Sequence, residues 1–180
     1  MSYIEDFKNH VGKWVFQREL KFNKRTKAVS NLENAKSIGI LYDATSEAQI
    51  KEIQPFVSFF FDLKKDVKAL GYVNAKSLSY CHTPKLQYDF FYLKDLNWYY
   101  KPQNYIIDNF ITKEYDILIN LCDSSCIPIK YLVASSIAKF KIGQHEKDYE
   151  IYDLMISLNE YDTIDKLMTE IKHYLHIINK

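Results

Sequence analysis

The chain has 180 residues and a mass of 21.4 kDa, which is the size of one ordinary domain. Apolar residues make up 47% of it and charged residues 26%, values typical of a globular protein, so a largely disordered chain is excluded. The net charge of +1 and the isoelectric point near 7.7 argue against a nucleic-acid-binding protein, which is usually strongly basic.

The N-terminal part differs in charge from the rest of the chain. Residues 1–36 carry eight Lys or Arg against four Asp or Glu. Apolar residues recur there at helical spacing, at Ile4, Phe7, Val11 and Trp14. We expect a helix from about residue 2 to 20, followed by an exposed basic connector. We therefore divide the chain into this helix and connector, residues 1–33, and an α/β domain, residues 34–180.

The domain is predicted to begin with a strand and a capped helix. The segment AKSIGILYD is a short apolar run ending in a turn signal, which is typical of a buried strand. Ser46 and Gln49 then form an S-x-x-Q capping box at a helix start. The apolar stripe of this helix is Ile50, Ile53, Val57, Phe60, Leu63 and Val67. We expect Pro55 to kink or split the helix and Gly71 to end it.

Strands and helices alternate through the rest of the chain. We expect strands at YVNA, LQYDFFYL, YDILINLC, AKFKIG and YDLMISL, and helices at about 105–112, 128–136 and 162–178. Such alternation indicates βαβ units, whose crossovers are right-handed. The predicted fold class is therefore α/β: a Rossmann-like three-layer sandwich with a mostly parallel sheet of five or six strands and helices on both faces.

Two loops of this fold form the candidate binding site. In an open α/β sheet, ligands bind beyond the carboxyl ends of the strands, where the strand order reverses. In the common order 3-2-1-4-5, that point lies between the first and fourth strands. The candidate ligand-binding residues there are Asp43, Thr45, Ser46, Asp123, Ser124 and Ser125, with Asn74 and Asn120 at neighbouring strand ends. Ser, Thr and Asp are also the usual helix caps, so a purely structural role stays open.

Familiar cofactor and metal motifs are missing from the sequence. Neither glycine-rich phosphate cradle, G-x-G-x-x-G or G-x-x-x-x-G-K-[ST], is present, so no nucleotide cofactor is predicted. Cys122 and Cys126 are not at zinc-knuckle spacing, so we predict no metal site. We interpret the cysteines as small buried hydrophobes, with Cys126, near a helix start, as the most suitable for reaction. An aromatic run at 98–100 lies in a predicted loop, and would exclude the site if it filled the crevice.

Four segments, KSIGILYDA, YDILINLCDS, SSIAKFKIG and YDLMISL, carry a family resemblance. From about residue 34 on, the chain resembles an uncharacterised family of bacterial, Rossmann-like domains of unknown function, which implies no activity. Residues 115–143 are also similar to the N-terminal half of heptosyltransferase-type glycosyltransferases, where a strand ending in Asp precedes a helix and a short strand ending in Gly. We expect no room for the second Rossmann domain of those enzymes, so no donor-binding residue is carried over.

We therefore expect a binding or interaction module without its own catalytic apparatus, with a small anionic or sugar-like ligand. The alternative is a nucleotide- or sugar-phosphate-binding transferase-like enzyme, or half-enzyme, acting with a partner. No apolar run approaches the roughly 20 residues of a membrane span, and no secretory signal is visible, so we predict a cytoplasmic protein. We expect no nucleic-acid partner, and a monomer or a homodimer, because the apolar stripe of the first helix needs a surface to cover it.

Overall fold

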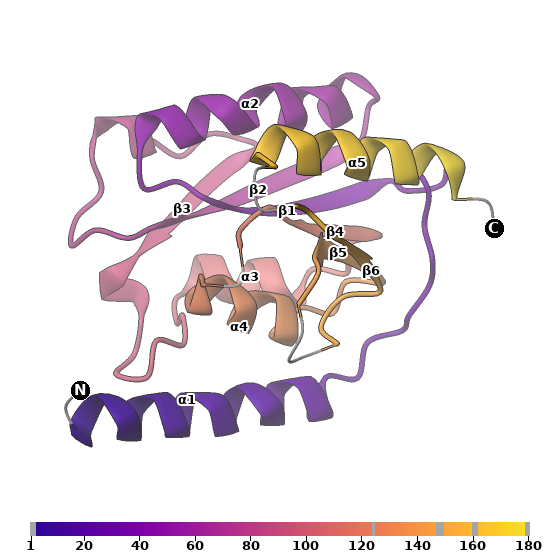
Figure 1. Cartoon of the computed structure of the whole chain (residues 1–180). Coiled ribbons are helices and arrows are strands. Elements are labelled where there is room, and N and C mark those ends of the chain that lie inside the picture. Colours follow the sequence, from indigo (N-terminus) through magenta and orange to yellow (C-terminus); the bar gives the residue numbers. More distant parts are fainter. Residues whose placement is uncertain (1–2, 124, 147–149, 160–161, 179–180) are drawn as a thin grey trace.

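The computed structural model describes residues 3–123, 125–146, 150–159 and 162–178, and the side chains of residues 3–9 lie outside this description (Figure 1). Its sheet has six parallel strands in the order β3-β2-β1-β4-β5-β6. The strands are β1 (Ser37–Asp43), β2 (Asp66–Val73), β3 (Tyr88–Tyr92), β4 (Ile117–Asn120), β5 (Phe140–Gln144) and β6 (Leu154–Ile156). The predicted α/β sandwich is confirmed.

Helices cover both faces of the sheet (Figure 1). On one face lie α2 (Glu47–Asp62) and α5 (Ile164–Ile177), and on the other lie α3 (Tyr105–Thr112) and α4 (Ile127–Ser135). The N-terminal helix α1 (Tyr3–Phe22) packs outside α4 as a further layer. Short 3-10 turns, Tyr80–His82 and Leu93–Asp95, flank β3. Over the described residues, no helix combines the length and the apolar character that a membrane crossing requires.

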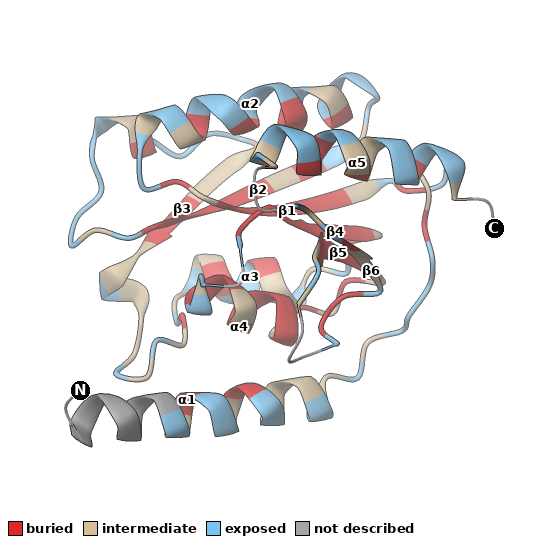
Figure 2. Cartoon of the chain, in the orientation of Figure 1, coloured by how far each residue is buried: buried red, intermediate tan, exposed pale blue. Residues whose placement is uncertain are grey.

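The sheet separates two hydrophobic cores, and β1 contributes to both (Figure 2). Side chains alternate between the two faces of a strand. Ile38, Ile40 and Tyr42 therefore belong to the core under α2 and α5, whereas Leu41 belongs to the core over α3 and α4. Because both faces of β1 are covered, its sequence is nearly continuously apolar, as expected for a central parallel strand.

Two boundary predictions between residues 46 and 75 are wrong. The helix α2 runs unbroken through Pro55, and the chain turns into β2 at Lys64, whose φ of 61° is left-handed. Gly71 lies inside β2 and does not end a helix. A Cβ at Gly71 would come within 2.6 Å of the Cβ of Ala44. The glycine is therefore explained by the close approach of the loop after β1.

A seam different from the predicted stripe holds α1 against α4. The ring of Phe16 is buried and meets the ring of Tyr131 edge-on, with centroids 5.7 Å apart. The Tyr131 hydroxyl donates a hydrogen bond of 2.5 Å to the carbonyl of Gly12. Trp14, which we placed in the stripe, is instead 59% exposed. Ile4 and Phe7 also belong to the predicted stripe, but their side chains lie outside the described part of the structure.

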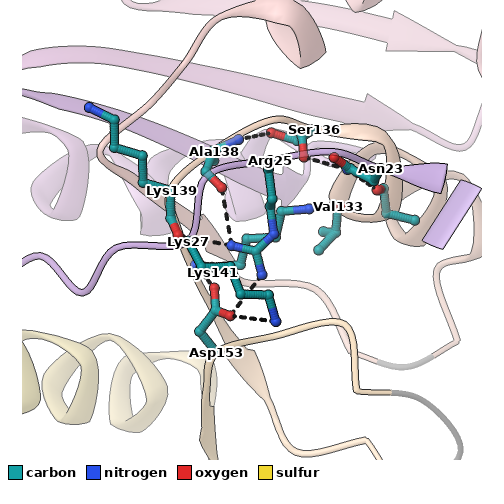
Figure 3. Close-up of polar contacts among 10 residues, drawn as sticks. Asn23, Arg25, Lys27, Val133, Ser136, Ala138, Lys139, Lys141 and Asp153 are labelled. Atoms are coloured by element: carbon teal, nitrogen blue, oxygen red, sulfur yellow. Dashed lines mark hydrogen bonds and ion pairs between the residues drawn. The ribbon is translucent and has the colours of Figure 1, made fainter. Parts of the chain in front are cut away.

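The connector after α1 is largely exposed, as predicted, but several of its side chains fix it to the domain. The Asn23 side chain donates hydrogen bonds to the carbonyls of Ala134, at 2.5 Å, and Ser136, at 2.7 Å, at the end of α4 (Figure 3). Further along the connector, the buried residues are Ser30, Leu32 and Ala35. The connector is therefore fixed to the domain by side chains that have no periodic pattern.

A buried lysine lies beside this connector (Figure 3). Lys141 in β5 is 2% exposed, and its ammonium group donates a hydrogen bond of 2.5 Å to the carbonyl of Val133. Next to it, the Arg25 guanidinium pairs with the Asp153 carboxylate at 2.7 Å. Burial lowers the pKa of Lys141 to about 7; the positive charges of Arg25 and Lys27 lower it, and Asp153 acts in the opposite direction.

We predict that Lys141→Met stabilises the protein most at pH 7 and below. The folded-state pKa of about 7 lies below the usual 10.5, so the unfolded chain binds more protons between these values. Between these pKa values, the contribution of Lys141 to the free energy of unfolding therefore rises with pH, by at most about 1.4 kcal/mol per pH unit. Below pH 7, the destabilisation of the folded state by Lys141 reaches its full value. Urea unfolding of the variant from pH 6 to 9.5 should lack this slope.

The exposed Lys36 offers a matched control, because Lys36→Met removes a positive charge without changing the core. This variant should keep the pH slope of the natural protein. If Lys141→Met keeps the slope as well, Lys141 is not the buried group that titrates in this range.

Candidate functional site

A cleft of about 390 Å³ opens at the carboxyl ends of β1 and β4. It lies where the strand order reverses, because β2 and β3 extend from one side of β1 and β4 to β6 from the other. The helix after β1 covers one face of the sheet, and the helix after β4 covers the opposite face (Figure 1). The two connections diverge there, which is the geometry of the ligand-binding switch point in open α/β sheets.

Two aspartates, one from each connection, line this cleft. Asp43 ends β1, and its Oδ1 atom accepts a hydrogen bond of 2.8 Å from the backbone N–H of Thr45. Asp123 follows β4 and repeats the arrangement, because its Oδ1 atom accepts from the backbone N–H of Ser125 at 2.8 Å and from the Ser125 hydroxyl at 2.5 Å. These Asx turns hold both carboxylates at the sheet edge. The structure thus brings Asp43, Asp123 and Ser125 together.

Two other candidates from these loops, Ser46 and Thr45, form hydrogen bonds with backbone groups. The Ser46 hydroxyl accepts a hydrogen bond of 3.3 Å from the N–H of Gln49, whose side chain accepts from the N–H of Ser46 at 2.9 Å. This is the predicted capping box of α2. The Thr45 hydroxyl accepts from the N–H of Asn74 at 3.0 Å, which joins the ends of β1 and β2. Ser124 lies outside the described residues.

Asn120 is buried behind the cleft, at the end of β4. Its amide nitrogen donates to the Tyr152 hydroxyl at 2.7 Å and to the carbonyl of Cys122 at 3.3 Å. Its amide oxygen accepts from the N–H of Cys122 at 2.9 Å. Since both ends of the amide are occupied, Asn120 fixes the turn that presents Asp123.

Sequence reasoning missed polar residues from three further elements that line the cleft. Gln49 and Glu52 come from the first turns of α2. Gln144 ends β5, and Thr163 is the N-cap of α5. Asp162 also lines the cleft, and its carboxylate accepts from the N–H of Asn159 at 2.7 Å. The carboxyl ends of parallel strands meet at one sheet edge, but finding these residues also required the positions of β5 and β6 in the sheet.

The cleft is electrostatically negative. Its described lining residues include four acids and no Lys, Arg or His; the acids are Asp43, Glu52, Asp123 and Asp162. The N-termini of α2, α4 and α5 also border it, and each contributes a dipole equivalent to about half a positive charge. Four carboxylates outweigh this contribution. The site therefore disfavours a bare phosphate and favours donors of hydrogen bonds.

The aromatic run at residues 98–100 does not fill the cleft. None of these three residues lines it. The carbonyl of Tyr99 instead lies against α1, since a Cβ added to Gly12 would stand 3.3 Å from it. These aromatic residues therefore do not exclude a binding site in the cleft.

The chain belongs to a family of unknown function, DUF6913, whose model matches residues 8–178. The matched region begins within α1 and includes the connector, whereas the sequence resemblance was placed from residue 34 on. No curated protein and no solved structure matches the chain. The local resemblance to heptosyltransferases, the bacterial origin and the division at residue 33 stay predictions.

We predict that Asn120→Ala destabilises the protein by about 2–3 kcal/mol, because it leaves the Tyr152 hydroxyl and the Cys122 backbone groups buried without partners. Tyr152→Phe removes only one of these hydrogen bonds and should have a smaller effect, about 1 kcal/mol. Urea unfolding measures both. Asn109→Ala, on the exposed face of α3, should change the stability by less than about 0.5 kcal/mol. An Asn120→Ala variant of unchanged stability would contradict the structural role.

Proposed function

We propose that this member of the DUF6913 family is a binding module whose cleft at the β1–β4 switch point takes a small, neutral or positively charged ligand rich in hydroxyl or amino groups. The observation that carries the proposal is the lining of the cleft, with two turn-held aspartates and no basic side chain among its described residues. A sugar-like molecule meets these requirements. An anionic ligand, our other expectation, is opposed by the charges.

The hydrogen-bonding character of the cleft supports this ligand class. Carboxylates only accept hydrogen bonds, and in both turns the Oδ1 atom is the one engaged by the backbone. Thr163 and Gln144 add hydroxyl and amide donors, and the Ser125 hydroxyl, which donates to Asp123, adds an acceptor. Apolar side chains also line the cleft, at Leu121, Leu158, Ile164 and Leu167, and suit the carbon face of a small ring. The volume of about 390 Å³ lies in the range of small-molecule sites.

The assembly and location of the protein are part of the proposal. The Phe16–Tyr131 ring contact and the Tyr131–Gly12 hydrogen bond join α1 to α4 within one chain. They support a monomer over a dimer in which two chains exchange α1. We propose a cytoplasmic monomer or homodimer that has no nucleic-acid partner. Light scattering should give one or two times 21.4 kDa, and a larger assembly would contradict this.

The ligand class is tested by a thermal-shift panel on the full chain. We expect neutral sugars, amino sugars or polyamines to stabilise the protein, and sugar phosphates and nucleotides to have little effect. A ligand at 100 times its Kd adds about 2.7 kcal/mol of stability. Asp43→Asn and Asp123→Asn keep an oxygen acceptor for their turns and remove only the charge, so they should weaken binding of a cationic ligand at least tenfold.

Asp108→Asn is the matched control, because Asp108 lies on the exposed side of α3, away from the cleft. It should bind like the natural protein. Preferential binding of a sugar phosphate or nucleotide, or turnover of one that Asp43→Asn abolishes, would contradict the proposal and favour the transferase-like alternative.

A further inference from the structure

Two of the three cysteines lie at the cleft, between β4 and α4. Cys122 follows β4 and is buried, whereas Cys126 is half-buried at the N-cap of α4, and both line the cleft. The backbone N–H of Cys126 donates to the carbonyl of Asp123 at 3.4 Å, which closes a tight turn between the two cysteines. Cys81 lies in a different part of the chain, in the 3-10 turn before β3.

The two thiols interact with each other and are chemically unequal. The interaction between the two thiols raises the pKa of Cys122 and lowers that of Cys126. Burial and the carboxylates of Asp43 and Asp123 raise the pKa of both, and the nearby backbone N–H of Ile129, in the first turn of α4, lowers that of Cys126. A thiol at a helix N-terminus is stabilised as the thiolate, which is the reactive form.

We propose that Cys122 and Cys126 are a dithiol that a small, positively charged disulfide, of the cystamine class, oxidises reversibly to an intramolecular disulfide. The cleft gives the reagent access to Cys126, the more exposed of the pair. Cys122 needs no access of its own, because it reacts only with Cys126. This chemistry does not depend on which ligand the cleft binds.

The reaction follows ordinary thiol–disulfide exchange. The Cys126 thiolate attacks one sulfur of the reagent, forms a mixed disulfide and releases the first small thiolate, which takes up a proton. The Cys122 thiol then loses its proton and attacks the Cys126 sulfur, which breaks the mixed disulfide and releases the second small thiolate. The protein loses two hydrogen atoms and two electrons, and the reagent is reduced to two thiols.

The test exposes the reduced full chain to buffers of cysteamine and its disulfide, cystamine, at pH 7. Acid quenching, alkylation with N-ethylmaleimide and peptide mass spectrometry then assign each cysteine. We expect a Cys122–Cys126 disulfide, with Cys81 alkylated. Cys122→Ser should stop at a mixed disulfide on Cys126, and Cys126→Ser should block oxidation at both positions. Cys81→Ser is the matched control and should oxidise like the natural protein.

A second measurement needs no variant at the pair. Alkylation of the natural protein by iodoacetamide over a range of pH should give Cys126 a rate midpoint below the usual pKa of a thiol, about 8.5. Oxidation of Cys81 in preference to the pair, disulfides between chains, or a Cys126 mixed disulfide that persists in the natural protein would overturn the inference. So would a chain that stays reduced throughout the cystamine series.

Discussion

The chain enters its sheet at the centre, at β1, and every later strand is added on one side of β1 or on the other. Since parallel crossovers are right-handed, the helix that leads to β2 and the helix that follows β4 must lie on opposite faces. Their first turns then separate over the same edge of the sheet. The cleft, the two Asx turns and the dithiol all lie at this edge. The order in which the strands assemble therefore determines where a ligand can bind.

A second constraint concerns the N-terminal helix α1 and the connector that follows it. The N-terminal helix packs on the domain through Phe16, Val15 and Leu20, and polar side chains fix the connector after it: Asn23 reaches the end of α4, and Arg25 pairs with Asp153 between β5 and β6. The Arg25–Asp153 pair lies next to Lys141, whose side chain is buried. Because the family match begins at residue 8, this layer is part of the unit that the family describes.

The sequence predicts the elements whose signals are local, and fails where the cause is a distant contact. The capping box of α2, the helix at 105–112 and the apolar strand before Asp123 depend on neighbouring residues, and all three were predicted. Gly71 was misinterpreted, because a glycine is required there by the close approach of the Ala44 Cβ, which follows a different strand. The attachment of the connector depends on Asp153, 128 positions from Arg25. Of the cleft, the two aspartates followed from the switch-point rule, whereas the contributions of Gln144 and Thr163 required the positions of β5 and β6.

Amide chemical shifts test most directly whether the switch-point cleft is the binding site. The ¹⁵N-labelled full chain is titrated with a mixture of small sugars and amines, and the perturbed amides are mapped on the fold. We predict that Asp43, Ser125, Gln144 and Thr163 shift together, although they come from four different segments, because the parallel sheet brings them to one edge. Shifts confined to α1, or to the separate cavity of about 230 Å³ beside Tyr105 and Asn109, would contradict the account.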